Sequence, residues 1–248
     1  MRHVLITGGG SGIGRAMAEA FAAAGDHVHV TDVDADALAT CPSAWDTSLC
    51  DVSDEAAIAA VCDKMPAIDV LCANAGIAGP TAAVEDVTLE AWRACLAISL
   101  DGAFLATKHA VPKMKQAGQG AIVVTSSTAG QYGYPYRSPY AAAKWGVIGL
   151  TKTLAMELGP FGIRANAICP GAVEGPRMDG VIAREAAAKG MSEEDVRSGY
   201  AAGVSMQTFV RASDIADMAV FLGSDAAARV SGQVIAVDGH TVNPDPKI

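Results

Sequence analysis

Short apolar runs alternate along this chain with longer, alanine-rich stretches that have the composition of helices. The apolar runs cover residues 3–6, 28–31, 68–72, 121–125, 165–169 and 233–237. Helices are predicted to begin near Gly12, Ser53, Thr88, Ser138 and Ser213. Because strands joined through helices pair in parallel, the alternation predicts an α/β fold with a parallel sheet that is covered on both faces.

Three stretches fit this rhythm less simply. A further strand, the third in chain order, is expected within residues 43–49, although its side chains are polar. Residues 88–117 could form one long helix with a kink at Pro112, since proline removes a helical hydrogen bond. Residues 171–205 are expected to form a helical insertion inside a single domain that spans residues 1–248, and residues 243–246 form an extended tail.

The charge of the chain limits the partners that it can bind. Its formal net charge is −9, and its 18 lysine and arginine residues are scattered along the sequence. Nucleic acids and anionic membrane surfaces both require clustered basic side chains. We therefore expect no nucleic acid and no membrane as a partner.

The cysteines and the N-terminus favour a cytoplasmic protein. The six cysteines include no Cys-x-x-Cys pair and no cysteine–histidine spacing of a zinc site, so neither disulfides nor a metal site is expected. The first apolar run ends at glycines directly after Thr7, which makes it too short for a signal peptide or a membrane span.

A glycine-rich turn follows the first predicted strand and opens the first predicted helix. Its candidate cofactor-binding residues are Gly8, Ser11, Gly12, Ile13 and Gly14. Glycines allow a tight turn and the close approach of a pyrophosphate, whose charge suits the free N–H groups of a helix N-terminus. The location of the turn therefore predicts a dinucleotide-binding site.

Asp32 ends the second predicted strand, 18 residues after Gly14. A carboxylate at this position can accept hydrogen bonds from both ribose hydroxyls of adenosine, and it would repel a 2′-phosphate. Neither Val33, which follows it, nor Ser11 in the glycine turn supplies a basic side chain. The sequence thus favours NAD over NADP, although an aspartate could also cap the next turn.

Two further groups of polar residues follow predicted strands. Asp51 and Val52 come after the third strand, and Asn74, Ala75 and Gly76 come after the fourth. Both groups fall at carboxyl ends of strands, where α/β sheets bind ligands. Each group alone is also compatible with an ordinary turn.

Tyr140 and Lys144 lie four residues apart on a predicted helix and therefore share one of its faces. An ammonium group beside a phenol stabilises the phenolate, so the pair could act as a base. One lysine would not lower the pKa of a tyrosine from about 10 to near neutrality, and a second positive charge such as an oxidised nicotinamide would help. Ser138 is expected to cap this helix, with Pro139 at its first position.

Over nearly its whole length the chain resembles the classical short-chain dehydrogenase/reductase family. The matching residues are Thr7, Gly8, Gly12, Ile13, Gly14, Asp51, Val52, Asn74, Ala75, Gly76, Ser127, Tyr140, Lys144, Pro170 and Gly171. Ser127 lies 13 residues before Tyr140, which is the usual spacing in that family. The resemblance implies a Rossmann-type, doubly wound sheet in one three-layer α/β/α domain, and a homotetramer assembled through the helices after the fourth and fifth strands.

The resemblance also implies roles for particular residues. Tyr140 would exchange a proton with the substrate oxygen, Ser127 would hydrogen-bond that oxygen, and Lys144 would bind the nicotinamide ribose. The other cofactor contacts that it implies belong to Asp51, Val52, Asn74, Ala75, Gly76, Pro170, Gly171 and Val173.

The chain departs from the family pattern at two places. Ser99 stands where the family usually has an asparagine whose backbone carbonyl holds a water in a proton relay to the lysine. A backbone carbonyl survives this substitution, so we expect activity to survive. Gly175-Pro176 replaces the frequent Thr-Pro, which removes one hydroxyl near the nicotinamide carboxamide.

These features predict an NAD-dependent oxidoreductase that interconverts a secondary alcohol and a ketone on a small to medium polar metabolite. One alternative is a 3-oxoacyl-carrier reductase that uses NADPH, and another is a non-catalytic NAD-binding sensor or scaffold. The insertion is expected to act as a lid over the nicotinamide. Candidate residues that line the substrate pocket are Tyr132, Tyr134, Tyr136, Arg137, Glu174, Arg177, Met178, Ile182 and Arg184. Arg137 or Arg177 could pair with an anionic substrate group, although both fit solvated loop arginines better.

Overall fold

The computed structural model describes residues 1–245, so Pro246, the last residue of the expected extended tail, lies outside the described residues. Within this range seven parallel strands form one sheet in the order β3-β2-β1-β4-β5-β6-β7. The strands are β1 (His3–Thr7), β2 (His27–Asp32), β3 (Asp46–Leu49), β4 (Val70–Ala73), β5 (Gly120–Thr125), β6 (Ile163–Pro170) and β7 (Val234–Val237). The predicted doubly wound α/β fold is confirmed.

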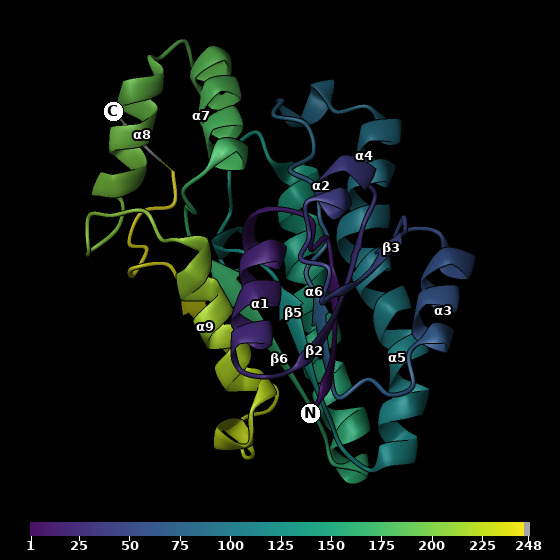
Figure 1. Cartoon of the computed structure of the whole chain (residues 1–248). Coiled ribbons are helices and arrows are strands. Elements are labelled where there is room, and N and C mark those ends of the chain that lie inside the picture. Colours follow the sequence, from purple (N-terminus) through teal and green to yellow (C-terminus); the bar gives the residue numbers. More distant parts are fainter. Residues whose placement is uncertain (246–248) are drawn as a thin grey trace.

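Helices cover both faces of the sheet (Figure 1). On one face lie α1 (Gly12–Ala23), α2 (Ala35–Ala39) and α9 (Ala212–Gly223), which share a core with the apolar side chains of β1, β2 and β4. On the other face lie α3 (Glu55–Lys64), α5 (Gly102–Ala117) and α6 (Ser138–Leu158). Because helices bury both faces of the sheet, the central strands consist of continuous apolar residues. This pattern allows the strands to be predicted from the sequence.

The strand between α2 and α3 is short and lies at the edge of the sheet. β3 occupies Asp46–Leu49, inside the stretch expected to contain it, and pairs only with β2. Most of its residues are exposed, which explains its polar sequence. At the opposite edge, β7 pairs with β6 alone.

The stretch from 88 to 117 is helical from Leu89 to Ala117, as predicted. α4 (Leu89–Leu96) leads into a π-helical segment at Ala97–Asp101, and α5 begins at Gly102. In the π-helical segment the Ser99 hydroxyl accepts a hydrogen bond from the loop after β4. Pro112 lies inside α5 without ending it, and a kink at this residue stays a prediction.

The start of α6 also differs from the prediction in detail. The helix begins at Ser138 itself, with Arg137 in the capping position and no side-chain cap. The Ser138 hydroxyl is buried without a hydrogen-bond partner, so its expected capping role is wrong. Pro139 nevertheless lies in the first turn of the helix, and this preset backbone places Tyr140 there too.

One helical run in residues 1–245, Leu89–Ala117, could cross a membrane by length and composition alone, with a mean hydropathy of 1.2. Helices of a protein core meet the same criteria. Ala106, Ala110 and Met114 from this run are fully buried in one cluster with Leu71 and Ile122 of the sheet. This packing accounts for its apolar composition.

The stretch that departs from the strand–helix rhythm forms two helices, α7 (Pro176–Lys189) and α8 (Glu193–Ala202). They pack on each other around Ile182, Ala186 and Val196. Figure 1 shows them projecting beyond the end of the sheet at which the strands end. Ser192 caps α8, since its hydroxyl accepts a hydrogen bond from the Asp195 N–H at 3.1 Å.

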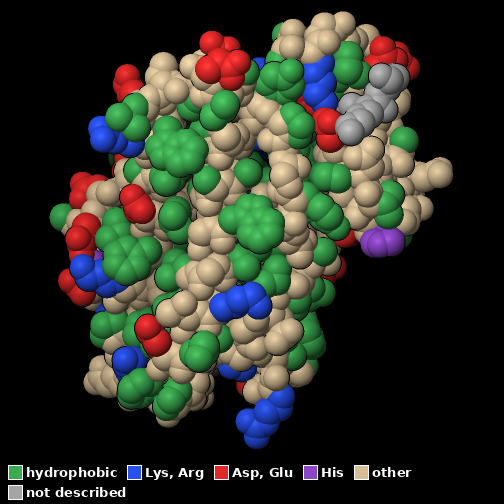
Figure 2. Space-filling model, turned by 180° about the vertical axis from the view of Figure 1, so that it is seen from behind, with side chains coloured by type: hydrophobic (Ala, Val, Ile, Leu, Met, Phe, Trp, Pro, Cys, Tyr) green, Lys and Arg blue, Asp and Glu red, His purple; other side chains and the backbone are tan. Residues whose placement is uncertain are grey.

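On the face of the molecule shown in Figure 2, neither positive nor negative side chains gather into a large patch. Figure 2 shows lysine and arginine side chains scattered singly among acidic and apolar ones on this face. The arrangement agrees with the scattering of basic residues along the sequence.

Candidate active site

A cavity of about 730 Å³ opens at the edge of the sheet where the strands end. It lies at the point where the strand order reverses between β1 and β4, which is the usual ligand site of open α/β sheets. Its lining includes these residues singled out in the sequence: Gly8, Ser11, Gly12, Ile13, Gly14, Asp32, Val33, Asp51, Val52, Asn74, Ala75, Gly76, Ser127, Tyr140, Lys144, Pro170, Gly171 and Val173. Ser99 is not among the lining residues.

The glycine turn needs glycine for both conformation and space. Gly8 and Gly12 have φ angles of 62° and 54°, in the left-handed region that side chains disfavour. A Cβ on Gly14 would lie only 2.1 Å from the Gly8 carbonyl oxygen. The turn therefore brings backbone close to backbone and leaves the N-terminus of α1 open to the cavity.

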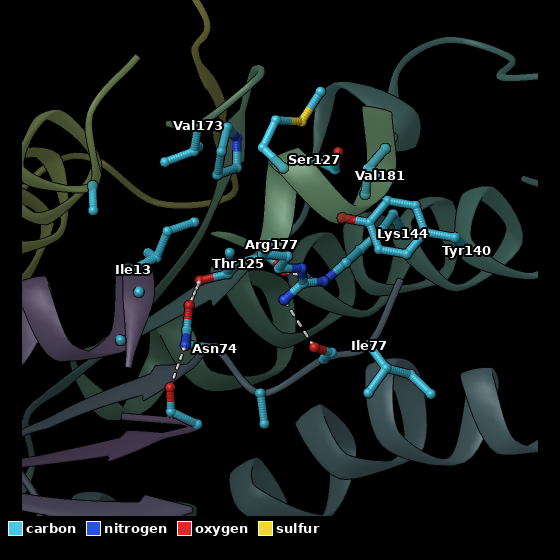
Figure 3. Close-up of a pocket in the computed structure, with 18 of the residues that line it drawn as sticks. Ile13, Asn74, Ile77, Thr125, Ser127, Tyr140, Lys144, Val173, Arg177 and Val181 are labelled. Atoms are coloured by element: carbon cyan, nitrogen blue, oxygen red, sulfur yellow. Dashed lines mark hydrogen bonds between the residues drawn. The ribbon is translucent and has the colours of Figure 1, made fainter. Parts of the chain in front are cut away.

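Asn74 connects the ends of three strands below the cavity (Figure 3). Its side-chain amide donates to the carbonyls of Thr7 and Gly8, both at 3.1 Å. Its side-chain oxygen accepts from the Thr125 hydroxyl at 3.1 Å. The Thr7 hydroxyl in turn accepts from the Asn74 and Ala75 N–H groups. The network holds β1, β4 and β5 in register at the cavity floor.

Asp32 is fixed at the end of β2. Its carboxylate accepts hydrogen bonds from the Gly10 N–H at 2.9 Å and from the Asp34 N–H at 3.1 Å. The neighbouring Val33 side chain is exposed. Arg15 of α1 pairs with Glu19 and stacks on Trp45. The Asp32 carboxylate lines this end of the cavity, and within residues 1–245 it forms no ion pair with a basic side chain.

Asp51 has a local role as well as a place in the cavity. Its carboxylate accepts from the backbone N–H and the hydroxyl of Ser53, at 2.9 and 2.7 Å. This is ordinary turn chemistry. Asp51 and Val52 nevertheless both line the same cavity as Asp32.

Ser127, Tyr140 and Lys144 meet at the opposite end of the cavity (Figure 3). Ser127 follows β5, while Tyr140 and Lys144 come from the first two turns of α6. The Lys144 ammonium is buried and donates to the Thr125 carbonyl at 2.7 Å, with its nitrogen 5.7 Å from the centre of the Tyr140 ring. The three side chains therefore form one cluster on rigid elements.

The electrostatics of this cluster favour the phenolate. Burial tends to raise the pKa of Tyr140, but Lys144, Arg177, the hydrogen bond from Ser127 and Arg137 together bring that pKa below its ordinary value. Burial also lowers the pKa of Lys144, while the neighbouring phenol counteracts this effect. Both shifts bring the two groups closer to the range in which proton transfer is useful.

Ser99 lies in the π-helical segment and is fully buried. Its hydroxyl accepts from the Ile77 N–H at 3.2 Å. A Cβ built on Gly76 would lie 3.4 Å from both the Ser99 hydroxyl and the Lys144 ammonium, so the two groups approach from one side. Ser99 therefore supports the loop after β4 from behind the cavity wall.

The residues expected around a substrate divide into two sets. Those that line the cavity are Tyr134, Arg137, Glu174, Arg177 and Met178. Tyr132, Tyr136, Ile182 and Arg184 do not line it. Arg177 reaches across the mouth and donates to the Gly76 carbonyl at 3.0 Å. Arg137 is only 8% exposed, so its interpretation as a solvated arginine is wrong.

Sequence reasoning missed several residues of the lining, among them Thr125, Thr128, Val181, Tyr200 and Ala212. Thr125 and Thr128 flank Ser127 at the end of a predicted strand, so their position offered a signal. Tyr200 lies on α8 of the insertion, and Ala212 is the first residue of α9, so both reach the cavity from segments distant in sequence from the other lining residues. No group of three or more potential metal ligands occurs within residues 1–245.

Comparison with known proteins gives one consistent result. A family model described as enoyl-(acyl carrier protein) reductase matches residues 8–240. Cis-4-hydroxycyclohexanecarboxylate dehydrogenase of Sinomonas cyclohexanicum is 38% identical over 250 residues, covering 96% of this chain and 95% of that protein. Levodione reductase of Leifsonia aquatica is 37% identical over 254 residues, covering 96% and 93%.

The fold comparison agrees with the sequence comparison. NAD⁺-bound xylitol dehydrogenase superposes with a TM-score of 0.93 at 28% identity, covering 96% of this chain and 98% of that one. The relatives thus match the chain from the glycine turn to the last strand. On this evidence the chain belongs to the short-chain dehydrogenase/reductase family, oxidoreductases that act on CH–OH groups and the corresponding carbonyls.

Proposed function

We propose that this protein uses NAD to interconvert a secondary alcohol and a ketone on a small to medium polar metabolite. The observation that carries the proposal is the Tyr140 phenol with its lowered pKa, held beside Lys144 in the cavity that the glycine turn opens into. The names of two relatives specify a hydroxycyclohexanecarboxylate and levodione. Cyclic ketones therefore belong at the head of a substrate panel.

The residues present fit a nicotinamide dinucleotide. The glycine turn leaves a backbone cradle that side chains would fill, and a Cβ on Gly10 would lie 3.0 Å from the Asp32 carboxylate. The turn would hold the pyrophosphate, Asp32 the adenosine ribose, and Asp51 with Val52 the adenine. Asn74, Ala75 and Gly76 would line the middle of the cleft, and Pro170, Gly171 and Val173 would hold the carboxamide. When bound, the cofactor supplies the hydride chemistry.

The protein's own side chains would move the proton. In the oxidation direction the Tyr140 phenolate would take the proton from the substrate hydroxyl, and in reduction the phenol would return it. Ser127 would hydrogen-bond the same oxygen and fix its position. Lys144 would stabilise the phenolate through its charge. Ser99 would contribute through its backbone carbonyl and by holding the loop at Ile77.

Replacing the phenol tests the assignment of the acid–base group. Tyr140→Phe is expected to lower turnover of every ketone on the panel by about 100-fold or more, because it removes the proton carrier. NADH affinity, measured by fluorescence titration, should remain nearly unchanged. Wild-type protein that binds NADH and turns over no ketone would contradict the proposal and favour the non-catalytic sensor or scaffold.

The lowered pKa of Tyr140 predicts a pH dependence with a definite sign. Alcohol oxidation should rise with pH as the phenol ionises, with a midpoint below the ordinary value of about 10 for tyrosine. Lys144→Met removes the nearby ammonium and should move the midpoint of the kcat/KM profile to higher pH. Lys152→Met removes a charge from the exposed side of the same helix and should leave the midpoint in place. An unshifted midpoint in Lys144→Met would reject this role.

The preference for NAD rests on Asp32, and a conservative change isolates its charge. Asp32→Asn retains a side-chain oxygen that can accept from the Gly10 N–H but removes the repulsion of a 2′-phosphate. The ratio of kcat/KM for NADH over NADPH should fall by about tenfold or more in this variant. A wild-type preference for NADPH would instead support the alternative of a 3-oxoacyl-carrier reductase.

We also infer a cytoplasmic homotetramer that assembles through α4–α5 and α6. Phe104 on α5 and Trp145 and Met156 on α6 are exposed apolar side chains that such an interface would cover. The six cysteines are free thiols, which suits a reducing compartment. Light scattering should give four times the chain mass, and Trp145→Asp should lower that mass. A monomeric wild-type protein would contradict the assembly.

A further inference from the structure

Arg137 is a buried cation in the wall of the cavity, and no carboxylate in residues 1–245 pairs with it. The residue is 8% exposed, and its Nε atom is buried without a hydrogen-bond partner. The one side-chain hydrogen bond that Arg137 makes within these residues goes to the backbone carbonyl of Ala78, at 3.3 Å. A buried charge without a counter-ion is costly, so a partner from outside the chain would be favourable here.

The backbone before Arg137 holds this side chain in place. Tyr136 has a φ angle of 60°, a conformation that a bulky residue rarely adopts. Its carbonyl accepts from the Ala82 N–H at 3.0 Å, which secures the strained turn. The Arg137 guanidinium then lies over the Tyr140 ring, with its carbon 4.8 Å from the ring centre. Strain of this kind commonly persists where it positions a functional group.

The acidic groups at this end of the cavity are not available to Arg137. Glu185 is buried, but its carboxylate is held by the Tyr200 hydroxyl at 2.6 Å and the Lys189 ammonium at 2.9 Å. Glu174 is exposed at the rim and forms no ion pair with Arg137 in the described part of the chain. Neither carboxylate at this end of the cavity therefore pairs with Arg137 in the described residues, and a ligand could supply one.

A second cation can reach the same place. Arg177 extends from the first turn of α7 into the cavity, and its hydrogen bond to a neutral backbone carbonyl leaves its charge unpaired. Both guanidiniums lower the pKa of the Tyr140 phenol, and both residues line the same cavity as Tyr140. Guanidinium groups bind carboxylates through two parallel hydrogen bonds, which would also fix the orientation of a substrate.

We propose that Arg137, assisted by Arg177, binds a carboxylate on the substrate, so that the preferred substrates are oxo acids and hydroxy acids. The short distance from Arg137 to Tyr140 means that the carboxylate lies only a few bonds from the carbonyl that reacts. This inference rests on the proposed oxidoreductase function and specifies its substrate class. In this proposal Arg137 selects substrates that carry a carboxylate and takes no part in the proton transfer.

A matched pair of ketones separates this role from a structural one. Wild-type enzyme should reduce 4-oxocyclohexanecarboxylate with a kcat/KM about 10- to 100-fold above that for 4-oxocyclohexanecarboxamide, since hydrogen bonds to charged groups are strong. Arg137→Leu should bring the ratio of the two values close to one. Arg137→Lys should restore part of it. A merely structural role would lower both values together and leave the ratio unchanged.

Two controls keep the outcomes distinct. Arg184→Leu removes an exposed charge from α7 outside the cavity and should leave the ratio as in the wild type. Cyclohexanecarboxylate, which cannot be reduced, should raise the Tm of the wild type and not of Arg137→Leu, while the carboxamide should raise neither. Equal turnover of acid and amide by the wild type would overturn the carboxylate site while leaving the oxidoreductase intact. Absence of any ketone turnover would instead contradict the oxidoreductase, and the Tm shifts would then test the carboxylate site alone.

Discussion

One amide side chain ties the functional end of the sheet together. Asn74 follows the end of β4, and its side chain donates a hydrogen bond to β1 and accepts one from β5. It therefore links the ends of three strands. The strand order reverses at this place, so the loops after β1 and β4 diverge to opposite sides of the sheet. Because Asn74 links the strand ends below them, the glycine turn and the Tyr140 cluster keep a fixed separation. A cofactor that spans both ends depends on that separation.

Much of the fold could be predicted because its causes are local. Strands buried on both faces are apolar throughout, and glycine and aspartate at their ends follow from backbone geometry. The residues proposed to hold the cofactor and to move the proton occupy these strand ends or the first turns of a helix, so the order of the elements along the chain brings them together. Spacing on α6 was sufficient to pair Tyr140 with Lys144.

The features that escaped prediction depend on contacts between distant segments. The helical run from Leu89 to Ala117 has a π-helical segment at Ala97–Asp101, where Ser99 bonds to the loop after β4. Arg137 is in a polar loop sequence, yet the turn at Tyr136 directs it inward, which no composition rule foresees. Tyr200 joins the cavity only through the packing of α7 against α8.

The close packing behind the reaction centre restricts where this protein can change during evolution or engineering. A Cβ on Gly130 would lie 2.4 Å from the Ser126 hydroxyl and 2.7 Å from the Lys144 carbonyl, and one on Gly171 would lie 2.9 Å from the Asp238 backbone. No side chain can be introduced from these directions. New substrate preferences are therefore expected to arise through α7, α8 and residues 131–137, and a library directed at those segments would leave Ser127, Tyr140 and Lys144 unchanged.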